Sequence, residues 1–367
     1  MSPLLFSLFI SNLGLELNSS GLGLDLEGVN ISSIFFADDL VLIGRCDSAL
    51  SSLMDITRTY CTYHKLKISE KKSKIMTYNA TTGKTTFIGS QQSTISLDEV
   101  ISFKYLGVPL GCKPYSLFKA FNDQVKKRSQ SYLSSVLSLV RLGPDRAELA
   151  FALWTSAALP SILYGCEVIP LTQSTISEVE RCQAQVGKFM LQLPRSSANV
   201  SACLDGGLKP VWAVVAEKVL LYACNTMKKP LGYWPRLAMT WNMEKGVKSP
   251  YTKYLLKWRS LTNACLLSGK LIKKSVNESA IKDVLKQQKQ YSSVFAMSPP
   301  DPTRKIEWFK PKAWVSDSSS SKIVARFRAC NASLGNRGPT KDGQFYRLCP
   351  LCSKDGVDAL NNEVNEP

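Results

Sequence analysis

Hydrophobic and polar positions alternate between helical and extended patterns over the first hundred residues. Residues 2–17 place leucines on one broad face of a predicted helix, at Leu4, Leu5, Leu8 and Leu15. Short apolar runs follow at 24–26, 34–36 and 40–43. The last two runs are separated by a short polar step, which predicts two strands joined by a tight turn.

The same mixture continues further along the chain. A helical stripe at 47–66 carries His64, the single histidine, which we interpret as a packed residue and not as a ligand or base. A strand is predicted at 75–78 and a hairpin at 104–110. Helical patterns punctuated by prolines follow at 116–141, 145–163, 174–192 and 210–228. Residues 229–345 are mixed, so the predicted fold class is α+β.

Composition indicates a globular protein of two or three domains. The chain has 367 residues, 44% of them hydrophobic, and lacks any run of about 18 apolar residues that would span a membrane. Its 11 cysteines are an odd number, and its start lacks the basic region and cleavage site of a signal peptide. We therefore expect reduced thiols in an intracellular protein, nuclear or cytoplasmic, that is not secreted and does not contact membranes.

The charge distribution suggests a polyanionic partner. The net charge is +17, and residues 228–354 hold 25 Lys and Arg against 7 Asp and Glu, whereas residues 1–100 hold 8 against 10. Tryptophans stand among these basic residues and could stack on bases. Lys282, Lys286 and Lys289 recur at helical spacing and form one positive stripe. This pattern favours RNA or DNA bound through phosphates without sequence preference, although a solvated basic surface has the same pattern.

Asp38 and Asp39 are the first candidate catalytic residues. They follow Phe36-Ala37 between two apolar strands. Two-metal phosphoryl transfer needs carboxylates on a rigid element, because the two ions lie about 3.5–4 Å apart and must meet both substrates. Adjacent aspartates in a strand turn can supply part of that ligand set. Taken alone, the tetrapeptide is more often ordinary turn chemistry.

Neighbouring motifs give the tetrapeptide a context. Residues 2–10, beginning Ser2-Pro3, and the box from Phe36 to Asp39 resemble two palm motifs of reverse transcriptases from non-LTR (LINE-type) retrotransposons. The block 66–74 resembles the next motif, in which Lys72 matches a lysine near the triphosphate. Residues 103–107 resemble the primer-grip hairpin, and 159–167 with 193–195 resemble the thumb and the region behind it.

The resemblance implies an RNA-directed DNA polymerase architecture with three parts. These are a partial palm at 1–112, a helical thumb region at 113–228 and a basic C-terminal region at 229–367. It also implies a Mg²⁺ site at Asp38 and Asp39, with Lys72 as a further catalytic residue. The resemblance assigns nucleic-acid or nucleotide contacts to the palm positions Ser2, Pro3 and Phe36 and to the primer-grip positions Tyr105, Leu106 and Gly107.

A departure from the family at the start of the chain leads us to expect an inactive fragment. The family carries its first metal-binding aspartate on a strand upstream of the residue 2–10 motif, and this chain starts at that motif. The acids available before the hairpin are Glu16, Asp25 and Glu27, and none follows such a strand. Mg²⁺ demands near-octahedral oxygen ligation, which two aspartates do not complete. The sequence thus predicts a reverse transcriptase remnant truncated at both ends.

A second metal site is suggested by Cys349 and Cys352. Their spacing provides half of a tetrahedral zinc site, and the family completes it with a later His and Cys. No His or Cys follows Cys352 here, and Cys330 could at most supply a third ligand. We expect an incomplete zinc knuckle whose zinc occupancy is doubtful.

Three other interpretations stay open. The missing parts could come from another chain or another start site, which would restore a polymerase. The chain could bind RNA or DNA through its basic C-terminal region without catalysis. It could also fail to form a stable protein, because an uncovered palm sheet would expose an edge and apolar faces.

Overall fold

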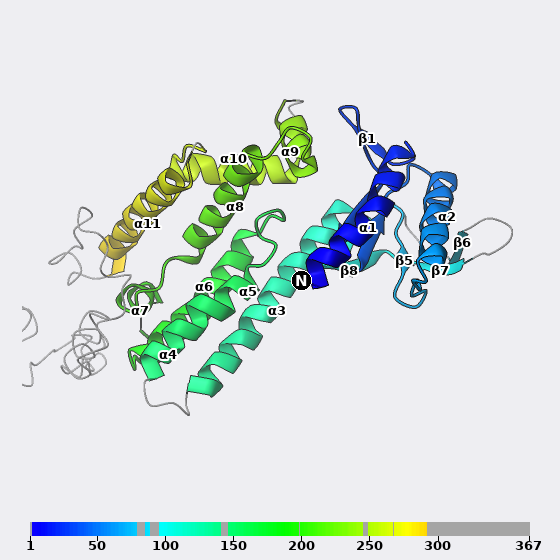
Figure 1. The fold of residues 1–367 in the computed structure, drawn as a ribbon. Coiled ribbons are helices and arrows are strands. Elements are labelled where there is room, and N and C mark those ends of the chain that lie inside the picture. The colour runs from blue at the N-terminus through cyan, green and yellow to red at the C-terminus, as the bar shows by residue number, and fades with distance from the viewer. Residues whose placement is uncertain are drawn as a thin grey trace, which may run out of the picture. The chain divides into compact units, whose positions relative to one another are not determined.

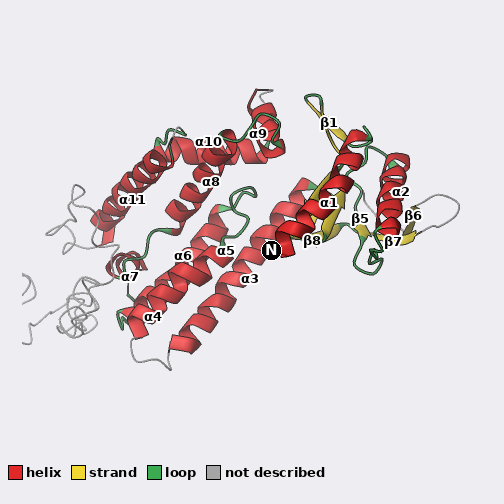
Figure 2. Ribbon diagram, in the orientation of Figure 1, coloured by secondary structure: helices red, strands yellow, loops and turns green. Residues whose placement is uncertain are grey.

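The computed structural model in Figure 1 describes residues 2–78, 85–88, 95–140, 146–197, 199–244, 249–266 and 268–291. The fold is mixed α+β and mostly helical, with small sheets confined to the first part of the described chain (Figure 2). This confirms the predicted class. The chain divides into two compact units. Unit 1 contains 1–121 and 226–252, and unit 2 contains 122–225 and the residues from 253 onward.

Unit 1 begins with a helix and two β-hairpins. The elements are α1 (Ser2–Ser19), β1 (Leu24–Leu26), β2 (Val29–Ile31), β3 (Ser33–Phe36), β4 (Asp39–Leu42) and α2 (Asp47–Tyr63). β1 pairs with β2 and β3 with β4, both antiparallel. Leu13 and Leu17 of α1 form a buried cluster with Leu53 of α2, and Phe35 and Leu40 pack against it. The cluster holds both helices against the β3–β4 hairpin.

Further short strands follow α2. These are β5 (Lys74–Ile75), β6 (Thr85–Ile88), β7 (Ile95–Glu99), β8 (Ser102–Tyr105) and β9 (Val108–Gly111). β7 is the central strand between β5, which is parallel to it, and β6, which is antiparallel. β8 and β9 form the hairpin predicted at 104–110. The strand predicted at 75–78 is wrong beyond Ile75, because β5 pairs only along Asp98 and Glu99, where β7 ends.

The apolar face expected on α1 is largely exposed. Relative exposures are 69%, 59%, 62% and 71% for Leu4, Leu5, Leu8 and Leu15, whereas Leu13 and Leu17 are buried. The helix contains leucine on more than one side, so spacing alone did not identify the side that packs. Single exposed leucines are common at protein surfaces, but four on one helix form an apolar stripe.

Unit 2 is built from helices. Its elements are most of α3 (Pro114–Val140), then α4 (Arg146–Leu153), η1 (Trp154–Ala158), α5 (Leu159–Ile162), α6 (Gln173–Met190), α7 (Asn199–Asp205), most of α8 (Val211–Met227), most of α10 (Pro250–Thr262) and α11 (Gly269–Tyr291). The second segment of unit 1 contributes α9 (Trp234–Glu244). The predicted helices at 116–141, 174–192 and 210–228 correspond to α3, α6 and α8, whereas the predicted 145–163 is split.

The split is caused by a wide turn. Residues Trp154–Ala158 form a π-helix between α4 and α5. Pro160 lacks an amide hydrogen and its ring would clash with the carbonyl of Ser156 in a regular α-helix. A π-turn just before the proline removes this conflict and lets the chain continue as a helix. Trp154 is fully buried at the start of that turn.

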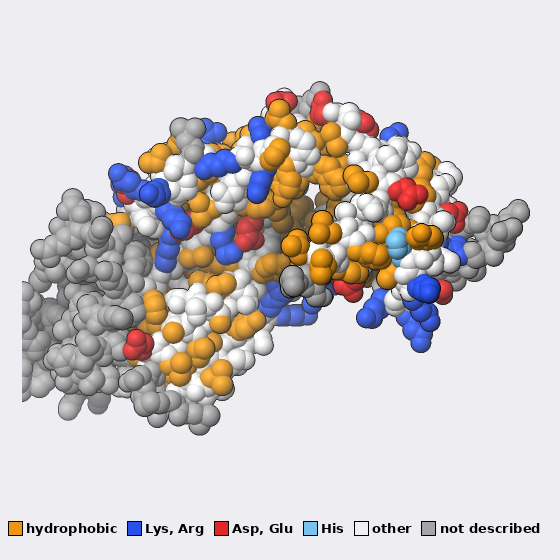
Figure 3. Space-filling model, viewed as in Figure 1, with side chains coloured by type: hydrophobic (Ala, Val, Ile, Leu, Met, Phe, Trp, Pro, Cys, Tyr) orange, Lys and Arg blue, Asp and Glu red, His pale blue; other side chains and the backbone are white. Residues whose placement is uncertain are grey.

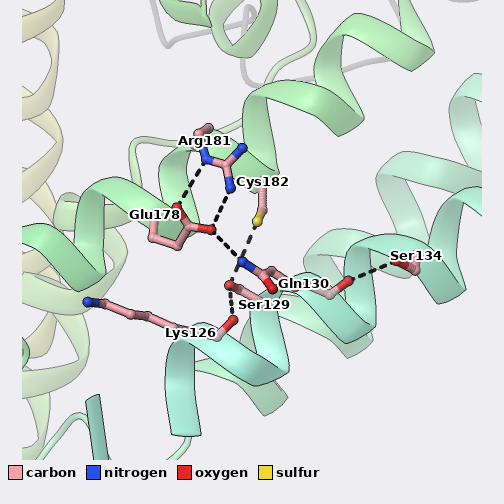
Figure 4. Close-up of polar contacts among 7 residues, drawn as sticks. All are labelled: Lys126, Ser129, Gln130, Ser134, Glu178, Arg181 and Cys182. Carbon is pink, nitrogen blue, oxygen red and sulfur yellow. Dashed lines mark hydrogen bonds and ion pairs between the residues drawn. The ribbon is translucent and has the colours of Figure 1, made fainter. Parts of the chain in front are cut away.

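Polar side chains, some of them buried, join the helices of unit 2. The indole nitrogen of Trp154 donates to the Gln183 side chain (3.1 Å), whose amide nitrogen donates to the Lys209 carbonyl (2.9 Å). The Asn122 side-chain nitrogen donates to the Pro170 carbonyl, and its side-chain oxygen accepts a bond from the Thr172 amide. Between α3 and α6, Glu178 accepts bonds from Arg181 and Gln130, and Cys182 contacts Ser129 (Figure 4). These contacts fix the register of the helices.

Candidate functional site

The Asp38-Asp39 pair lies at the tip of a two-residue hairpin. Phe36 pairs with Asp39 across the strands, which leaves Ala37 and Asp38 as the turn. Ala37 has φ +52°, a left-handed conformation that costs a residue with a β-carbon about 1–2 kcal/mol. Both aspartates are exposed. A strained turn that keeps two carboxylates in solvent suggests a functional constraint.

The base of this hairpin is held by α1. Gly14 of α1 lies against Phe35, so that a β-carbon on Gly14 would come within 3.3 Å of the phenyl ring. Asn18 at the end of α1 accepts a hydrogen bond from the Ser32 amide (3.1 Å). The Ile43 amide donates to the Ser32 carbonyl and extends the ladder by one bond beyond β4. The turn is thus exposed, while the strands behind it are fixed.

A second hairpin places an aromatic residue close to the aspartates. Leu106 (φ +47°) and Gly107 (φ +81°) form the turn between β8 and β9, and positive φ at both positions is typical of a type I′ hairpin turn. Burial, together with the nearby charge of Asp39, raises the pKa of the Tyr105 hydroxyl. That hydroxyl is buried and forms no hydrogen bond with any described residue. Tyr105 is therefore near enough to Asp39 to respond to its charge.

The family comparison covers this whole arrangement. A family model described as reverse transcriptase (RNA-dependent DNA polymerase) matches residues 1–110, which include α1 and the β3–β4 and β8–β9 hairpins. Residues 1–110 belong to the reverse transcriptase family. The resemblance stated from the motifs is confirmed for this segment.

Two curated proteins show distant similarity over a longer stretch. A putative uncharacterized transposon-derived protein of Caenorhabditis elegans is 21% identical over 232 residues, covering 59% of this chain and 78% of that protein. The retrovirus-related Pol polyprotein from type-1 retrotransposable element R2 of Popillia japonica is 24% identical over 220 residues. That match covers 57% of this chain and 29% of the polyprotein, so the chain spans less than a third of it.

The carboxylates of the reverse transcriptase domain do not complete a metal site within the described residues. No group of three or more His, Cys, Asp or Glu side chains is arranged there to hold a metal ion. The reverse transcriptase family implies Mg²⁺, and the two ions of a phosphoryl-transfer site lie about 3.5–4 Å apart, so that carboxylates from more than one place are needed to hold both. Asp38 and Asp39 alone do not fit a metal pair. Glu16, Asp25 and Glu27 do not join them in such a group.

Other predicted site residues of the domain are placed less completely. Phe36 is 60% exposed beside the turn. Lys72 is exposed on a turn after α2, and no hydrogen bond or ion pair joins its side chain to another described residue. The backbone of Ser2 and Pro3 begins α1, whereas their side chains lie outside the described part. The sites assigned to these residues stay predictions.

Some of the candidate residues predicted in the C-terminal region lie within the described part of the chain and others do not. Lys282 and Lys286 are exposed on α11, with Ile272, Val276 and Ala280 buried on the opposite side at four-residue steps. The side chain of Lys289 is outside the described part, as are Cys330, Cys349 and Cys352. The predicted zinc half-site therefore stays a prediction. Among the helices that the structure describes, none combines enough length with enough apolar character to cross a membrane.

Two features of the site were missed by sequence reasoning. The strain at Ala37 has no sequence signal, because alanine is not a residue that favours positive φ. The proximity of Tyr105 to Asp39 depends on how two hairpins pack, although their turn signals were each readable. By contrast, the prediction that His64 is a packed residue agrees with the structure. The His64 ring centroid lies 4.8 Å from that of Phe9 and 4.2 Å from that of Tyr60.

Proposed function

We propose that this chain is the palm and thumb portion of an RNA-directed DNA polymerase of the non-LTR retrotransposon kind. The palm spans 1–112, the thumb region 113–228 and a basic region 229–367. The observation that carries the proposal is the Asp38-Asp39 turn beside Tyr105, inside the segment that matches the reverse transcriptase family. Asp38 and Asp39 serve as metal ligands, and the β8–β9 turn supports the primer end.

The 367-residue chain, tested alone, binds nucleic acid but does not extend a primer. Phosphoryl transfer is catalysed mainly by positioning and by metal charge at the developing anion. The described residues offer two carboxylates at the turn and no third acid grouped with them. Lost orientation by itself can forfeit roughly 7–11 kcal/mol of barrier lowering. Polymerisation would need a carboxylate from outside the described residues.

Primer extension tests this proposal directly. The chain is incubated with a labelled primer on an RNA or DNA template, with deoxynucleotides and either Mg²⁺ or Mn²⁺. The matched control is the double variant Asp38→Asn with Asp39→Asn. We expect equal, background-level extension by both proteins. Extension by the unmodified chain well above the double variant would show a complete site and overturn the proposed inactivity.

A second function, nucleic-acid binding through the basic C-terminal region, is favoured by its charge. On α10 and α11, lysines and arginines are exposed, and Figure 3 shows them gathered over these two helices. Two of them, Lys282 and Lys286, lie one helical turn apart on α11, opposite its buried side. Such spacing gives a row of charges that can follow a phosphate backbone without reading bases.

Salt dependence distinguishes this function from a merely soluble surface. Affinity for single-stranded RNA should fall steeply with salt, because each neutralised phosphate releases counterions. The double variant Lys282→Gln with Lys286→Gln should lower the slope of log affinity against log salt by about 1.4, at about 0.7 per phosphate contact. A flat salt dependence of the unmodified chain, or no binding at low salt, would contradict nucleic-acid binding.

A further inference from the structure

The C-terminus of α2 ends in a conformation that disfavours the residue found there. The Leu66 amide donates to the Cys61 carbonyl (2.7 Å) and the Lys65 amide to the Thr62 carbonyl (3.2 Å). This pair of bonds is the Schellman motif, whose left-handed position is usually glycine. Here Lys65 occupies it at φ +56°. The fold therefore accepts backbone strain at a position where glycine would be comfortable.

The segment after this cap alternates between inward and outward side chains. His64, Leu66 and Ile68 are half-buried, whereas Lys65 and Lys67 are exposed. His64 packs between the rings of α1 and α2, and Ile68 lies against the buried cluster of Met54, Ile75 and Leu97. Inward anchors on both sides of each lysine hold the backbone in place. Lys65 and Lys67 both remain exposed, two positions apart.

Positive charge at this cap is not neutralised locally. None of Lys65, Lys67, Lys71 and Lys72 forms an ion pair with another described residue, and all four are exposed. The turn that carries the last two is closed on Ser69, which accepts bonds from the Lys72 and Ser73 amides (3.1 and 3.0 Å). Glu70 is the sole acid between 64 and 73. Figure 3 shows lysines clustered on the loop below α2.

An aromatic ring stands next to these charges. Tyr63, the last residue of α2, is 82% exposed, the largest exposure among the large hydrophobic side chains described. Its ring meets the His64 ring edge-on, with centroids 4.9 Å apart and planes at 86°. His64 itself contacts the Phe9 ring edge-on and the Tyr60 ring at a tilt of 42°. The Tyr63 ring is thus in contact with His64 and largely exposed to solvent. An exposed aromatic ring of this kind can stack on a base.

We propose that Tyr63, Lys65 and Lys67 (the α2 cap surface) bind single-stranded nucleic acid, with a base stacked on Tyr63 and phosphates held by the two lysines. The proposal rests on the proposed nucleic-acid binding of the chain and assigns it a surface distinct from the Asp38-Asp39 turn and from α11.

The ring favours a single strand over a duplex. Bases in a duplex are stacked on one another and leave no face for a protein ring, whereas unpaired bases can stack on aromatic side chains. Lysines alone would contact either form through phosphates. The combination of Tyr63 with Lys65 and Lys67 therefore predicts preference for unpaired RNA or DNA, without sequence specificity.

The key variant is Lys65→Gly with Lys67→Gln in the full 367-residue chain. Binding of a labelled single-stranded RNA is titrated at several salt concentrations. We expect the slope of log affinity against log salt to decrease by about 1.4, at about 0.7 per lost phosphate contact. Lys65→Gly alone should also move the denaturation midpoint to higher denaturant, because glycine relieves the positive φ. Weaker binding from a more stable protein excludes a folding artefact.

The aromatic contribution is tested by Tyr63→Ala against Tyr63→Phe. Alanine should weaken single-strand binding by between about 5- and 150-fold, the range measured for loss of a stacked base, and leave duplex binding unchanged. Phenylalanine should retain the affinity, since the ring is preserved. If Tyr63→Ala leaves single-strand affinity unchanged, or weakens duplex binding equally, the stacking site is wrong.

A charge-matched variant completes the design. Lys113→Gln with Lys119→Gln removes two exposed positive charges elsewhere in unit 1 and should leave the salt slope unchanged. Equal slope changes in both double variants would show that any exposed lysine pair contributes equally to binding. That result would overturn the proposal. Absence of binding by the unmodified chain at low salt would instead refute the proposed nucleic-acid binding itself. Single-strand binding displaced by an acidic peptide would assign the surface to a protein partner and overturn the proposal too.

Discussion

Unit 1 and unit 2 use polar side chains in opposite ways. Unit 1 exposes Asp38 and Asp39 on one turn and Lys65 and Lys67 on another, and both turns contain a non-glycine residue at positive φ. Unit 2 buries Gln183 between helices, where its side chain accepts a hydrogen bond from Trp154 and donates one to the Lys209 carbonyl. In unit 1 the exposed carboxylates and lysines therefore lie on turns with backbone strain, whereas in unit 2 the two hydrogen bonds of Gln183 link one part of the helical packing to another.

The largest expected effect is on the buried side of this comparison. Trp154→Ala should destabilise unit 2 by about 3–5 kcal/mol, because it empties a fully buried site and leaves Gln183 without its donor. Leu8→Ala on the exposed face of α1 should change stability by no more than about 0.5 kcal/mol. Denaturant unfolding measures the stability of both variants. It is followed by far-ultraviolet circular dichroism, because fluorescence would change when Trp154 is removed. Similar losses would erase the contrast between the units.

A smaller loss is expected where two helices touch. A β-carbon on Gly187 of α6 would lie 2.5 Å from the Ala202 carbonyl oxygen of α7, a backbone atom that cannot rotate away. Gly187→Ala should therefore cost about 1–3 kcal/mol. The matched control is Gly232→Ala, where no heavy atom lies within 4 Å of the added carbon. Unfolding midpoints that agree for the two variants would show that α6 and α7 can separate freely.

The strained turn predicts a change of opposite sign. Ala37→Gly relieves the positive φ before Asp38 and should stabilise unit 1 by up to about 1 kcal/mol, after the added flexibility of the unfolded chain is subtracted. Ala158→Gly, inside the helical stretch of unit 2, should destabilise by about 1 kcal/mol. The same substitution thus separates the two regions by direction. Destabilisation at both positions would rule out strain at Ala37.

The smallest effect concerns pH. Burial, and then the charge of Asp283, raises the pKa of Glu180 on α6, although a bond from the Trp212 amide opposes the shift. The protonated carboxyl then favours folding, so its contribution is present below about pH 4.3 and is lost as pH rises through the folded-state pKa. Glu180→Gln should match the unmodified protein at pH 4 and exceed its thermal stability at pH 7. Equal stability at both values would contradict the raised pKa.

Much of unit 1 could be predicted because its signals are local. Apolar runs around Asp38-Asp39 and around Leu106-Gly107 specify hairpins without reference to distant residues, and both hairpins are present. Local patterns did not predict which side of α1 packs, since leucines occur on several sides. The approach of Tyr105 to Asp39 was also out of reach, because it depends on the packing of two hairpins separated by more than sixty positions.

In unit 2, prediction failed where charge hides periodicity. α10 and α11 were read as mixed sequence because lysines interrupt their apolar residues, although the buried residues Ile272, Val276 and Ala280 keep a four-residue step. The short α7 has too few residues to display a period. The π-turn before Pro160 could not be read at all, because prolines usually indicate that a helix ends and here the helix widens instead.

The division of unit 1 into two chain segments has a consequence for synthesis. Residues 226–252 belong with residues 1–121, yet the ribosome makes the intervening segment of unit 2 first. At about 5–20 residues per second, the nascent chain waits several seconds before unit 1 can be completed. The exposed leucines of α1 are accessible throughout that interval, so the order of translation makes this helix an early contact for chaperones.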